Sequence, residues 1–357
     1  MPIAGLLLAG VSIRVLVVGA LLLSGATIPA LLRLSDGAAY AAVARMFVTG
    51  VRPDTLPDGV FPGWPALVAL PGWIVGYDAA ALWGGVLCAA VVPVLVDRLT
   101  GDRPLAWLLA VAPPTWLMHS MLGMSEPAAL ALVLGALLAF QTSRSTLAST
   151  LVMAALLMRP HALAAWLALA FAFWRDRDLG GLARHGAVAA LVGGLTLVWN
   201  QAYYGDALYQ LHTYETLTNY SNAEAVLAAH GVGPGHWGAP FRHLVMTPIW
   251  IPVPPWKVVF IWAHVAAVLG ASAIGVARWG RSRLHDLFTV WAVMNTAFIV
   301  CAGPYWGFHS FDRYTVWALP AYAFLLRQVV PGRPRLLAAA GAVSTVLAWV
   351  GLQRHPL

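Results

Sequence analysis

Charged residues are scarce in this sequence, and their scarcity excludes a large water-soluble domain. Only 10% of the 357 residues are Asp, Glu, Lys or Arg, whereas an average soluble domain has about 25%. Lysine is nearly absent, since Lys257 is the single lysine among 21 basic residues. Hydrophobic residues make up 60% of the chain, and the mean hydropathy is +0.75. Repeated apolar runs of about 17–25 residues are typical of transmembrane helices, so the sequence predicts an integral membrane protein.

Several catalytic and cofactor motifs are also missing. The two cysteines, Cys88 and Cys301, lie within apolar runs, which argues against a disulfide framework or a zinc site. There is no P-loop, no dinucleotide-binding glycine motif, no His-Glu-x-x-His and no Gly-x-Ser-x-Gly. The first loop has no Asp-x-Asp or Glu-x-Asp pair, so the sequence requires neither a metal nor another cofactor. The net charge of +7 comes from arginines in short loops, and a nucleic-acid partner is not predicted.

The apolar runs predict an all-α polytopic membrane protein with about eleven transmembrane helices in one domain over 1–357. One module would cover about 1–204, and more variable helices about 205–357. The first loop is expected to hold a short helix over 36–49 and an interfacial helix over 62–76, which contains Pro and Gly and is too short to cross. The expected crossings are 5–32, 79–97, 104–120, 126–141, 146–158, 160–174, 186–204, 257–277, 287–303, 314–330 and 335–353. The pieces 146–158 and 160–174 are short and could instead form one long span broken at Arg159-Pro160.

Arginines set the predicted orientation. They concentrate in alternate short loops, which places the N-terminus in the cytoplasm by the positive-inside rule. The loop with Asp36, the turn at Ser125-Glu126, the break at Arg159-Pro160-His161 and the loops 205–256 and 304–313 then share the extracytoplasmic side. The composition, rich in Ala, Gly and Arg, indicates a bacterial inner (plasma) membrane. Chemistry, if present, is predicted to face outward.

Asp36 is the first candidate for chemistry. It lies just after the first apolar span, one helical turn from Tyr40, so the two side chains share a face. A carboxylate there could act as a general base on an acceptor hydroxyl. It could equally cap the helix over 36–49. Glu126, at the head of another span, could contact a substrate hydroxyl, or it could simply complement the helix dipole.

Basic and acidic side chains at two further helix boundaries are candidates for substrate binding. Arg159 precedes Pro160 and His161 at a helix break, and guanidinium geometry suits phosphate. The alternative is an arginine that snorkels to the membrane surface. Asp312 and Arg313 end the last large outer loop, where they could contact phosphate or sugar, pair with each other, or cap the next helix.

These clusters resemble those of the GT-C superfamily of integral-membrane glycosyltransferases, and most closely the GPI mannosyltransferase II (PIG-V-like) family with its bacterial relatives. The resemblance follows the order of the motifs along nearly the whole chain. They are Asp36 to Tyr40, Phe61-Pro62-Gly63-Trp64-Pro65, Ser125-Glu126, Met158-Arg159-Pro160-His161, and Arg313-Tyr314 before Pro320. The chain departs from the family in Ser35, where a Trp is usual, in Pro127 and in His161.

The resemblance implies an inverting transfer of a sugar, often mannose, from a polyprenyl-phosphate donor to a lipid or glycan acceptor. Asp36 would be the base, Arg159 and Arg313 would hold the phosphate, and Tyr40 and Glu126 would shape the sugar or acceptor site. Lipid tails would enter between helices. Two other classes stay open: a transporter or flippase for a lipid-linked or small solute, which would place ionisable residues near the bilayer midplane, and a catalytically silent subunit.

Overall fold

The computed structural model describes residues 3–51, 60–209, 255–301, 311–329 and 343, and all regular secondary structure in these ranges is helical. The all-α prediction is therefore confirmed for the described residues. The chain falls into two compact units, one formed by residues 1–162, 183–188 and 331–357, the other by 163–182 and 189–330. The sequence-based division near residue 204 stays a prediction.

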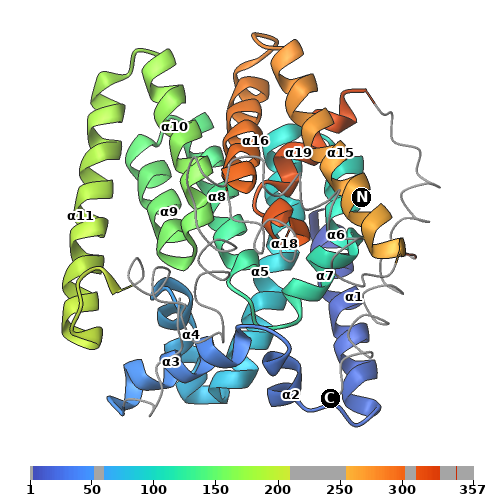
Figure 1. Ribbon diagram of the computed structural model, residues 1–357, viewed down its shortest axis with the longest axis vertical. Helices are drawn as coiled ribbons and strands as arrows, with labels where there is room; N and C mark the ends of the chain where they lie inside the picture. The colour runs from blue at the N-terminus through green and yellow to red at the C-terminus, as the bar shows by residue number, and fades with distance from the viewer. Residues whose placement is uncertain (1–2, 52–59, 210–254, 302–310, 330–342, 344–357) are drawn as a thin grey trace. The chain divides into compact units, whose positions relative to one another are not determined.

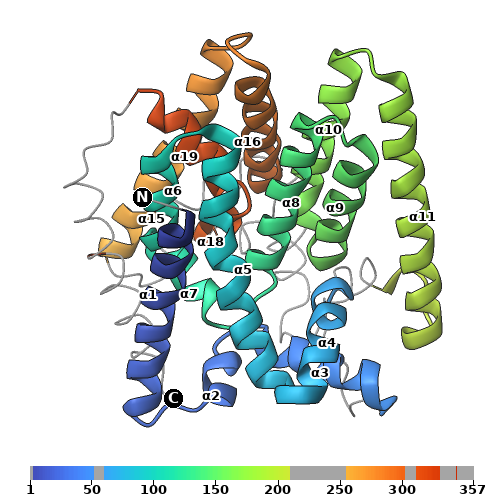
Figure 2. The same ribbon diagram turned by 180° about the vertical axis from the view of Figure 1, so that it is seen from behind.

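The first unit is built around one long central helix, α5 (Tyr77–Thr100), which contacts most of its other helices. Figures 1 and 2 show α2, α3 and α4 gathered around one end of α5, while α8 and α9 run side by side as a helical hairpin. The remaining elements of this unit are α1 (Ile3–Leu23), α2 (Ile28–Arg33), α3 (Gly37–Thr49), α4 (Gly63–Val75), α6 (Arg103–Val111), α7 (Pro114–Ser120), α8 (Glu126–Gln141), α9 (Ser145–Met158) and the 3-10 turn η1 (Pro160–Ala162).

The first expected span, 5–32, is not one helix. The helix α1 ends at Leu23, and the chain turns at Gly25, whose φ of +100° is a backbone conformation that favours glycine. A new helix, α2, starts after Thr27, whose hydroxyl accepts a hydrogen bond from the Ala30 backbone N–H at 3.3 Å. The apolar run is thus divided by local turn chemistry that hydropathy alone does not register.

The expected span 104–120 is also broken, because Pro113 and Pro114 supply no backbone N–H. In a continuous helix these two positions would bond the carbonyls of Leu109 and Ala110. Two side chains take their place: the Trp116 indole N–H donates to Leu109 O at 2.9 Å, and Arg14 Nη1 donates to Ala110 O at 3.1 Å. Each carbonyl freed by a proline is therefore satisfied by a side chain.

Arg14 is fully buried in the middle of α1. Its Nε donates to Ser120 Oγ at 2.6 Å, Nη1 also donates to Gly10 O at 2.8 Å, and the guanidinium lies 5.6 Å from the Trp116 ring centroid. Arg14 lies within the first span expected from the sequence, 5–32. The contacts give it a structural role, which is to fasten α1 to the α6–α7 break.

Replacing Arg14 by leucine is expected to destabilise the protein by about 1–3 kcal/mol or more, because a carbonyl in apolar surroundings then loses its donor. Trp116→Phe removes the other donor and is expected to act in the same direction. The thermal unfolding midpoint in one detergent, at one scan rate, measures both effects. Trp174→Phe is a matched control, since Trp174 is 62% exposed. Midpoints equal to wild type for both variants would contradict this role.

The interfacial helix predicted over 62–76 is confirmed as a short helix, α4. Thirteen residues give a helix of about 20 Å, which is shorter than the roughly 30 Å hydrocarbon core. Large apolar side chains on α4 remain exposed, namely Leu67, Leu70, Trp73, Ile74 and Val75. Their repeat of three and four residues places most of them along one face.

The second unit contains α10 (Leu163–Arg175), most of α11 (Leu179–Tyr204), α15 (Pro255–Ala277), α16 (Arg283–Cys301), α18 (Phe311–Val316) and α19 (Leu319–Arg327). Ion pairs between Arg175 and Asp286 and between Arg283 and Asp176 connect the end of α10 to the start of α16. Buried polar contacts join α16 to α19, where Asn295 Nδ2 donates to Tyr322 Oη at 3.1 Å. The expected span 314–330 is divided into α18 and α19 ahead of Pro320.

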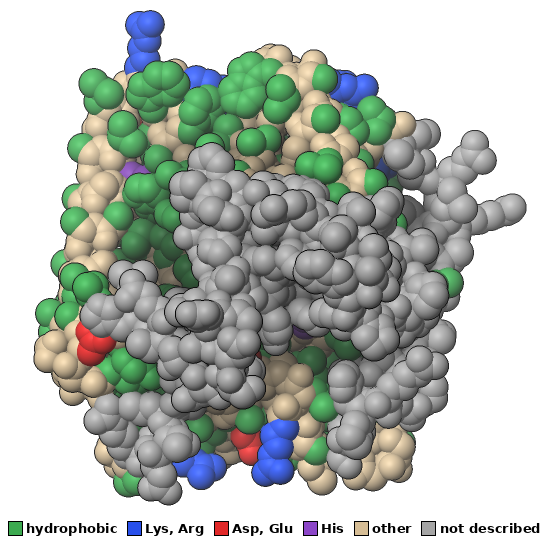
Figure 3. All heavy atoms as spheres, viewed as in Figure 1, with side chains coloured by type: hydrophobic (Ala, Val, Ile, Leu, Met, Phe, Trp, Pro, Cys, Tyr) green, Lys and Arg blue, Asp and Glu red, His purple; other side chains and the backbone are tan. Residues whose placement is uncertain are grey.

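The number of membrane crossings expected from the sequence is not confirmed. Among the described residues three helices are long and apolar enough to cross a bilayer, namely α1, α5 and α11. Shorter apolar helices include α4, α8, α9 and residues 263–277 of α15. The last expected span, 335–353, lies outside the described residues except for position 343. Hydrophobic side chains cover much of the described surface in Figure 3, as expected for a protein surrounded by lipid.

Candidate active site

Three helix ends from distant parts of the sequence meet in the first unit and bring a carboxylate, a hydroxyl and a guanidinium together. Asp36 precedes α3, Ser125 precedes α8, and Arg159 follows α9. Arg159 has extended backbone (φ −159°, ψ 135°), because the helix ends before Pro160. The break at Arg159-Pro160 predicted from the sequence is confirmed, with separate helices on either side.

Arg159 is the centre of this cluster. Its Nη2 donates to Asp36 Oδ2, and its Nε donates to Ser125 Oγ at 3.1 Å. The same Nη2 lies 3.9 Å from Glu126 Oε1, and the guanidinium carbon lies 5.5 Å from the centroid of the Tyr40 ring. Tyr40 in turn shares a hydrogen bond with Ser125, with 3.3 Å between Oη and Oγ. One guanidinium therefore fixes the relative positions of four other side chains.

Solvent access differs sharply within the cluster. The Asp36 side chain is 41% exposed, whereas the side chains of Arg159 and Glu126 are 9% and 0% exposed. Tyr40 and Ser125 are buried as well. Asp36 is therefore the member of the cluster that a substrate reaches most easily, and it is held in place from the buried side.

This geometry bears on two structural roles that the sequence allowed, a helix cap for Asp36 and a snorkelling position for Arg159. Asp36 occupies the N-cap position of α3, but its side chain makes no capping hydrogen bond and instead pairs with Arg159. The Asp36 side chain therefore does not cap α3, and its catalytic role stays a prediction. Arg159 does not snorkel to a surface, because its side chain is buried and bonded to Asp36 and Ser125.

Local packing explains why Asp36 faces Arg159. Gly37 lies so close to the segment before α8 that an added Cβ would stand 2.1 Å from Leu122 O. Ser35 Oγ donates to the same carbonyl at 3.3 Å. Trp64, the aromatic residue of the Phe-Pro-x-aromatic-Pro stretch, donates its indole N–H to Gly123 O at 2.8 Å. The first loop is therefore fastened to the chain just before Ser125.

Replacing Gly37 by alanine is expected to push α3 away from Leu122, since the new Cβ would overlap a backbone carbonyl. We expect a stability loss of about 1–3 kcal/mol, typical of overpacking, and a displaced Asp36. The thermal unfolding midpoint measures the stability loss. Gly19→Ala is the matched control, because nothing lies within 4 Å of its added Cβ. Identical behaviour of the two variants would contradict the close contact.

The other predicted site residues are placed as follows. His161 lies in η1, two residues after Arg159, and is half-buried. Asp312 and Arg313 lie in α18 of the second unit, and the side chain of Asp312 is outside the described residues. Ser125 was absent from the predicted site residues, although the Ser-Glu motif at the head of α8 pointed to it. Its hydroxyl contacts both Tyr40 and Arg159.

A metal ion was not required by the sequence, and this stays a prediction. Within the described ranges, no group of three or more His, Cys, Asp or Glu side chains is arranged to hold an ion. In the cluster itself, the Arg159 guanidinium lies near both the Asp36 and the Glu126 carboxylates.

The apolar helices and this cluster together describe a helical membrane protein. Its first loop carries a partly exposed carboxylate, Asp36. No family model matches the chain, and no curated protein matches it. Among solved structures, the chain is similar to the apo crystal structure of the oligosaccharyltransferase of Archaeoglobus fulgidus, with a TM-score of 0.50 and 13% identity. The match covers 88% of this chain and 51% of the archaeal chain. The described part of the chain thus has a fold similar to that of this enzyme, and the chain spans about half of the enzyme's length.

Proposed function

We propose that the protein is a GT-C-type membrane glycosyltransferase that moves a sugar from a polyprenyl-phosphate donor to an acceptor hydroxyl. Mannose is the first sugar to test, because the sequence motifs resemble those of GPI mannosyltransferase II. The observation that carries the proposal is the Asp36 carboxylate, 41% exposed and held by the buried Arg159. The likeness of the fold to an archaeal oligosaccharyltransferase supports the same class of enzyme.

The proposed reaction is a single displacement at the anomeric carbon. Asp36 accepts the proton of the acceptor hydroxyl while the acceptor oxygen bonds to that carbon. The bond between the anomeric carbon and the phosphate oxygen breaks, and polyprenyl phosphate leaves with the bonding electron pair. Because the acceptor attacks the face opposite the leaving group, the configuration inverts. The donor is already activated, so the protein's own contribution is to bind, orient and accept a proton.

In this proposal Arg159 has two tasks. Its contacts with Asp36 and Ser125 orient the base, and its positive charge stabilises the negative charge that develops on the phosphate. Tyr40 and Glu126 keep the guanidinium in position from the buried side. The roles proposed for His161, Asp312 and Arg313 in binding the sugar or the phosphate rest on the sequence resemblance.

The proposed location is a bacterial plasma membrane, with the N-terminus in the cytoplasm and Asp36 on the extracytoplasmic side. The positive-inside distribution of arginine supports this orientation. The exposed apolar face of α4 supports a position of the first loop at the membrane surface. A lipid-linked donor and a lipid or glycan acceptor would then reach Asp36 from the bilayer, with their tails among the helices.

The test is sugar transfer by the purified protein in detergent. Polyprenyl phosphates carrying mannose, glucose, galactose or arabinose are supplied with a mixture of lipid and glycan acceptors, and both transfer and donor hydrolysis are measured. Turnover of one donor is the expected result, and the anomeric configuration of the product distinguishes inversion from retention. Absence of turnover, combined with transport of the same lipids in proteoliposomes, would favour the transporter alternative.

A further inference from the structure

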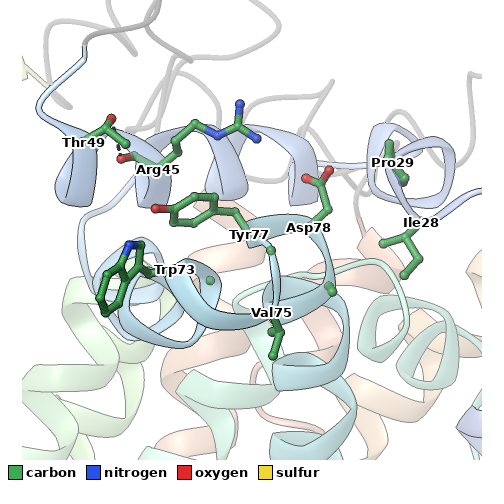
Figure 4. A pocket seen from close by; sticks show the side chains of 11 residues that line it. Ile28, Pro29, Arg45, Thr49, Trp73, Val75, Tyr77 and Asp78 are labelled. Atoms are coloured by element: carbon green, nitrogen blue, oxygen red, sulfur yellow. Dashed lines mark hydrogen bonds between the residues drawn. The ribbon is translucent and has the colours of Figure 1, made fainter.

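A second site lies on the other side of α3 from Asp36. An open surface pocket of about 640 Å³ is bordered by α2, the end of α3, the end of α4 and the start of α5. Its polar side chains include Arg45 on α3 and Asp78 on α5, and its apolar lining includes Trp73 and Val75 (Figure 4). Arg45 follows Asp36 by nine residues, about two and a half turns or 14 Å along the helix. The pocket is therefore separate from the candidate active site.

The two charged side chains of the pocket lie beside Tyr77. The Arg45 guanidinium carbon lies 5.5 Å from the centroid of the Tyr77 ring, and Figure 4 shows Asp78 next to Tyr77, with its carboxylate on the same side of the pocket as the guanidinium. Among the residues that the structure describes, no ion pair joins either Arg45 or Asp78 to another side chain. The pocket thus offers one positive and one negative group to a ligand.

The backbone around the pocket keeps this arrangement in place. An added Cβ on Gly72 would stand 2.4 Å from Tyr77 Cδ1, so the Tyr77 ring lies directly on α4. Gly76 has a φ of +90°, which permits the sharp turn from α4 into α5. Both glycines allow Tyr77 and Asp78 to follow α4 closely and to face Arg45. The pocket is therefore built by the fold rather than by long surface side chains alone.

Apolar side chains extend from the pocket along the exposed face of α4. Trp73 is 70% exposed and Val75 is 62% exposed, and both line the pocket. Leu70 and Ile74 continue the apolar surface beyond it. A ligand that fits both parts has a head with a positive and a negative group and a hydrocarbon tail. An acidic lipid alone would leave Asp78 facing a like charge, and a purely apolar ligand would bury both charges without partners.

From these observations we propose that the pocket binds the headgroup of a zwitterionic phospholipid of the ethanolamine type. The phosphate contacts Arg45, because guanidinium donors suit phosphate oxygens. The ammonium contacts Asp78, and the acyl chains lie over Trp73 and the apolar face of α4. Such a lipid would fasten the first loop to the membrane surface on the side of α3 opposite Asp36. The inference does not depend on the proposed catalytic function.

The test is lipid binding to the delipidated protein in micelles, measured by native mass spectrometry. Phosphatidylethanolamine and phosphatidylglycerol with identical acyl chains are compared. We expect about tenfold tighter binding of phosphatidylethanolamine, the effect of one charge-assisted contact. Arg45→Gln should weaken both lipids. Asp78→Asn should weaken phosphatidylethanolamine and strengthen phosphatidylglycerol, which removes the preference.

Two control variants establish whether the lipid preference belongs to this pocket. Arg33→Gln changes an exposed arginine on α2 outside the pocket and should leave the preference intact. Asp36→Asn should also leave it intact, so a failure of the proposed enzyme function would not affect the result. Equal binding of the two lipids by wild type, or an unchanged preference in Asp78→Asn, would overturn the proposal. Displacement of phosphatidylethanolamine by polyprenyl phosphate, dependent on Arg45, would overturn it in favour of a substrate site.

Discussion

Replacing Asp36 by asparagine is expected to lower the rate of sugar transfer by roughly 10²–10⁴-fold, the usual contribution of a general base. Asparagine cannot accept the proton of the acceptor hydroxyl, but its side-chain oxygen can still accept the hydrogen bond from Arg159 that Asp36 accepts in the structure. The variant is therefore expected to fold normally and to bind the donor. The measurement is the initial rate of transfer from the donor that wild type uses, together with the unfolding midpoint.

Asp206→Asn makes the same chemical change at a matched position. Asp206 Oδ1 accepts the backbone N–H of Leu208 at 2.9 Å, and asparagine retains that acceptor. We expect wild-type rates for this variant. An Asp36→Asn enzyme that turns over as fast as wild type would remove Asp36 from the chemistry. A slow enzyme with a lowered unfolding midpoint would indicate a structural role for Asp36 in place of a catalytic one.

Arg159→Leu is expected to have the largest effect on stability, about 3–5 kcal/mol, as found when one partner of a buried ion pair is removed. It removes the positive charge 3.9 Å from the fully buried Glu126 carboxylate, the donor to Ser125 and the contact with the Tyr40 ring. It also releases Asp36, so transfer is expected to be abolished. Thermal unfolding in one detergent and the transfer assay measure both losses.

Two further variants separate stability from positioning. Arg159→Lys keeps the positive charge, but a lysine ammonium lacks the planar set of N–H donors with which the guanidinium contacts Ser125 and Asp36 at the same time. It is expected to be more stable than Arg159→Leu and still nearly inactive. Adding Glu126→Gln to Arg159→Leu removes the buried charge and should recover part of the stability without restoring transfer. Arg33→Leu, on an exposed arginine, should change stability by about 0.5 kcal/mol or less. Full activity of Arg159→Lys would contradict the orienting role.

The helical architecture and the positions of several helix ends follow from the order of residues alone. Long apolar runs can satisfy their backbone polar groups in lipid only as helices or closed barrels, so the all-α prediction needed no tertiary information. The helix over 36–49, the short helix near 62–76 and the break at Arg159-Pro160 were predicted correctly. Hydropathy failed where prolines and a glycine divide an apolar run, at Gly25 and at Pro113-Pro114.

Which of these helix ends form a site depends on how the helices pack against one another. Asp36 and Arg159 are 123 positions apart, and helical periodicity describes neighbours within one helix but not contacts between helices. The pairing depends on close backbone contacts, such as Gly37 against Leu122 and Gly63 against Leu157. The same holds for Arg14, whose role is set by the contact of α1 with the carbonyl of Ala110. Packing, which selects among many possible helix arrangements, supplies the information that local sequence lacks.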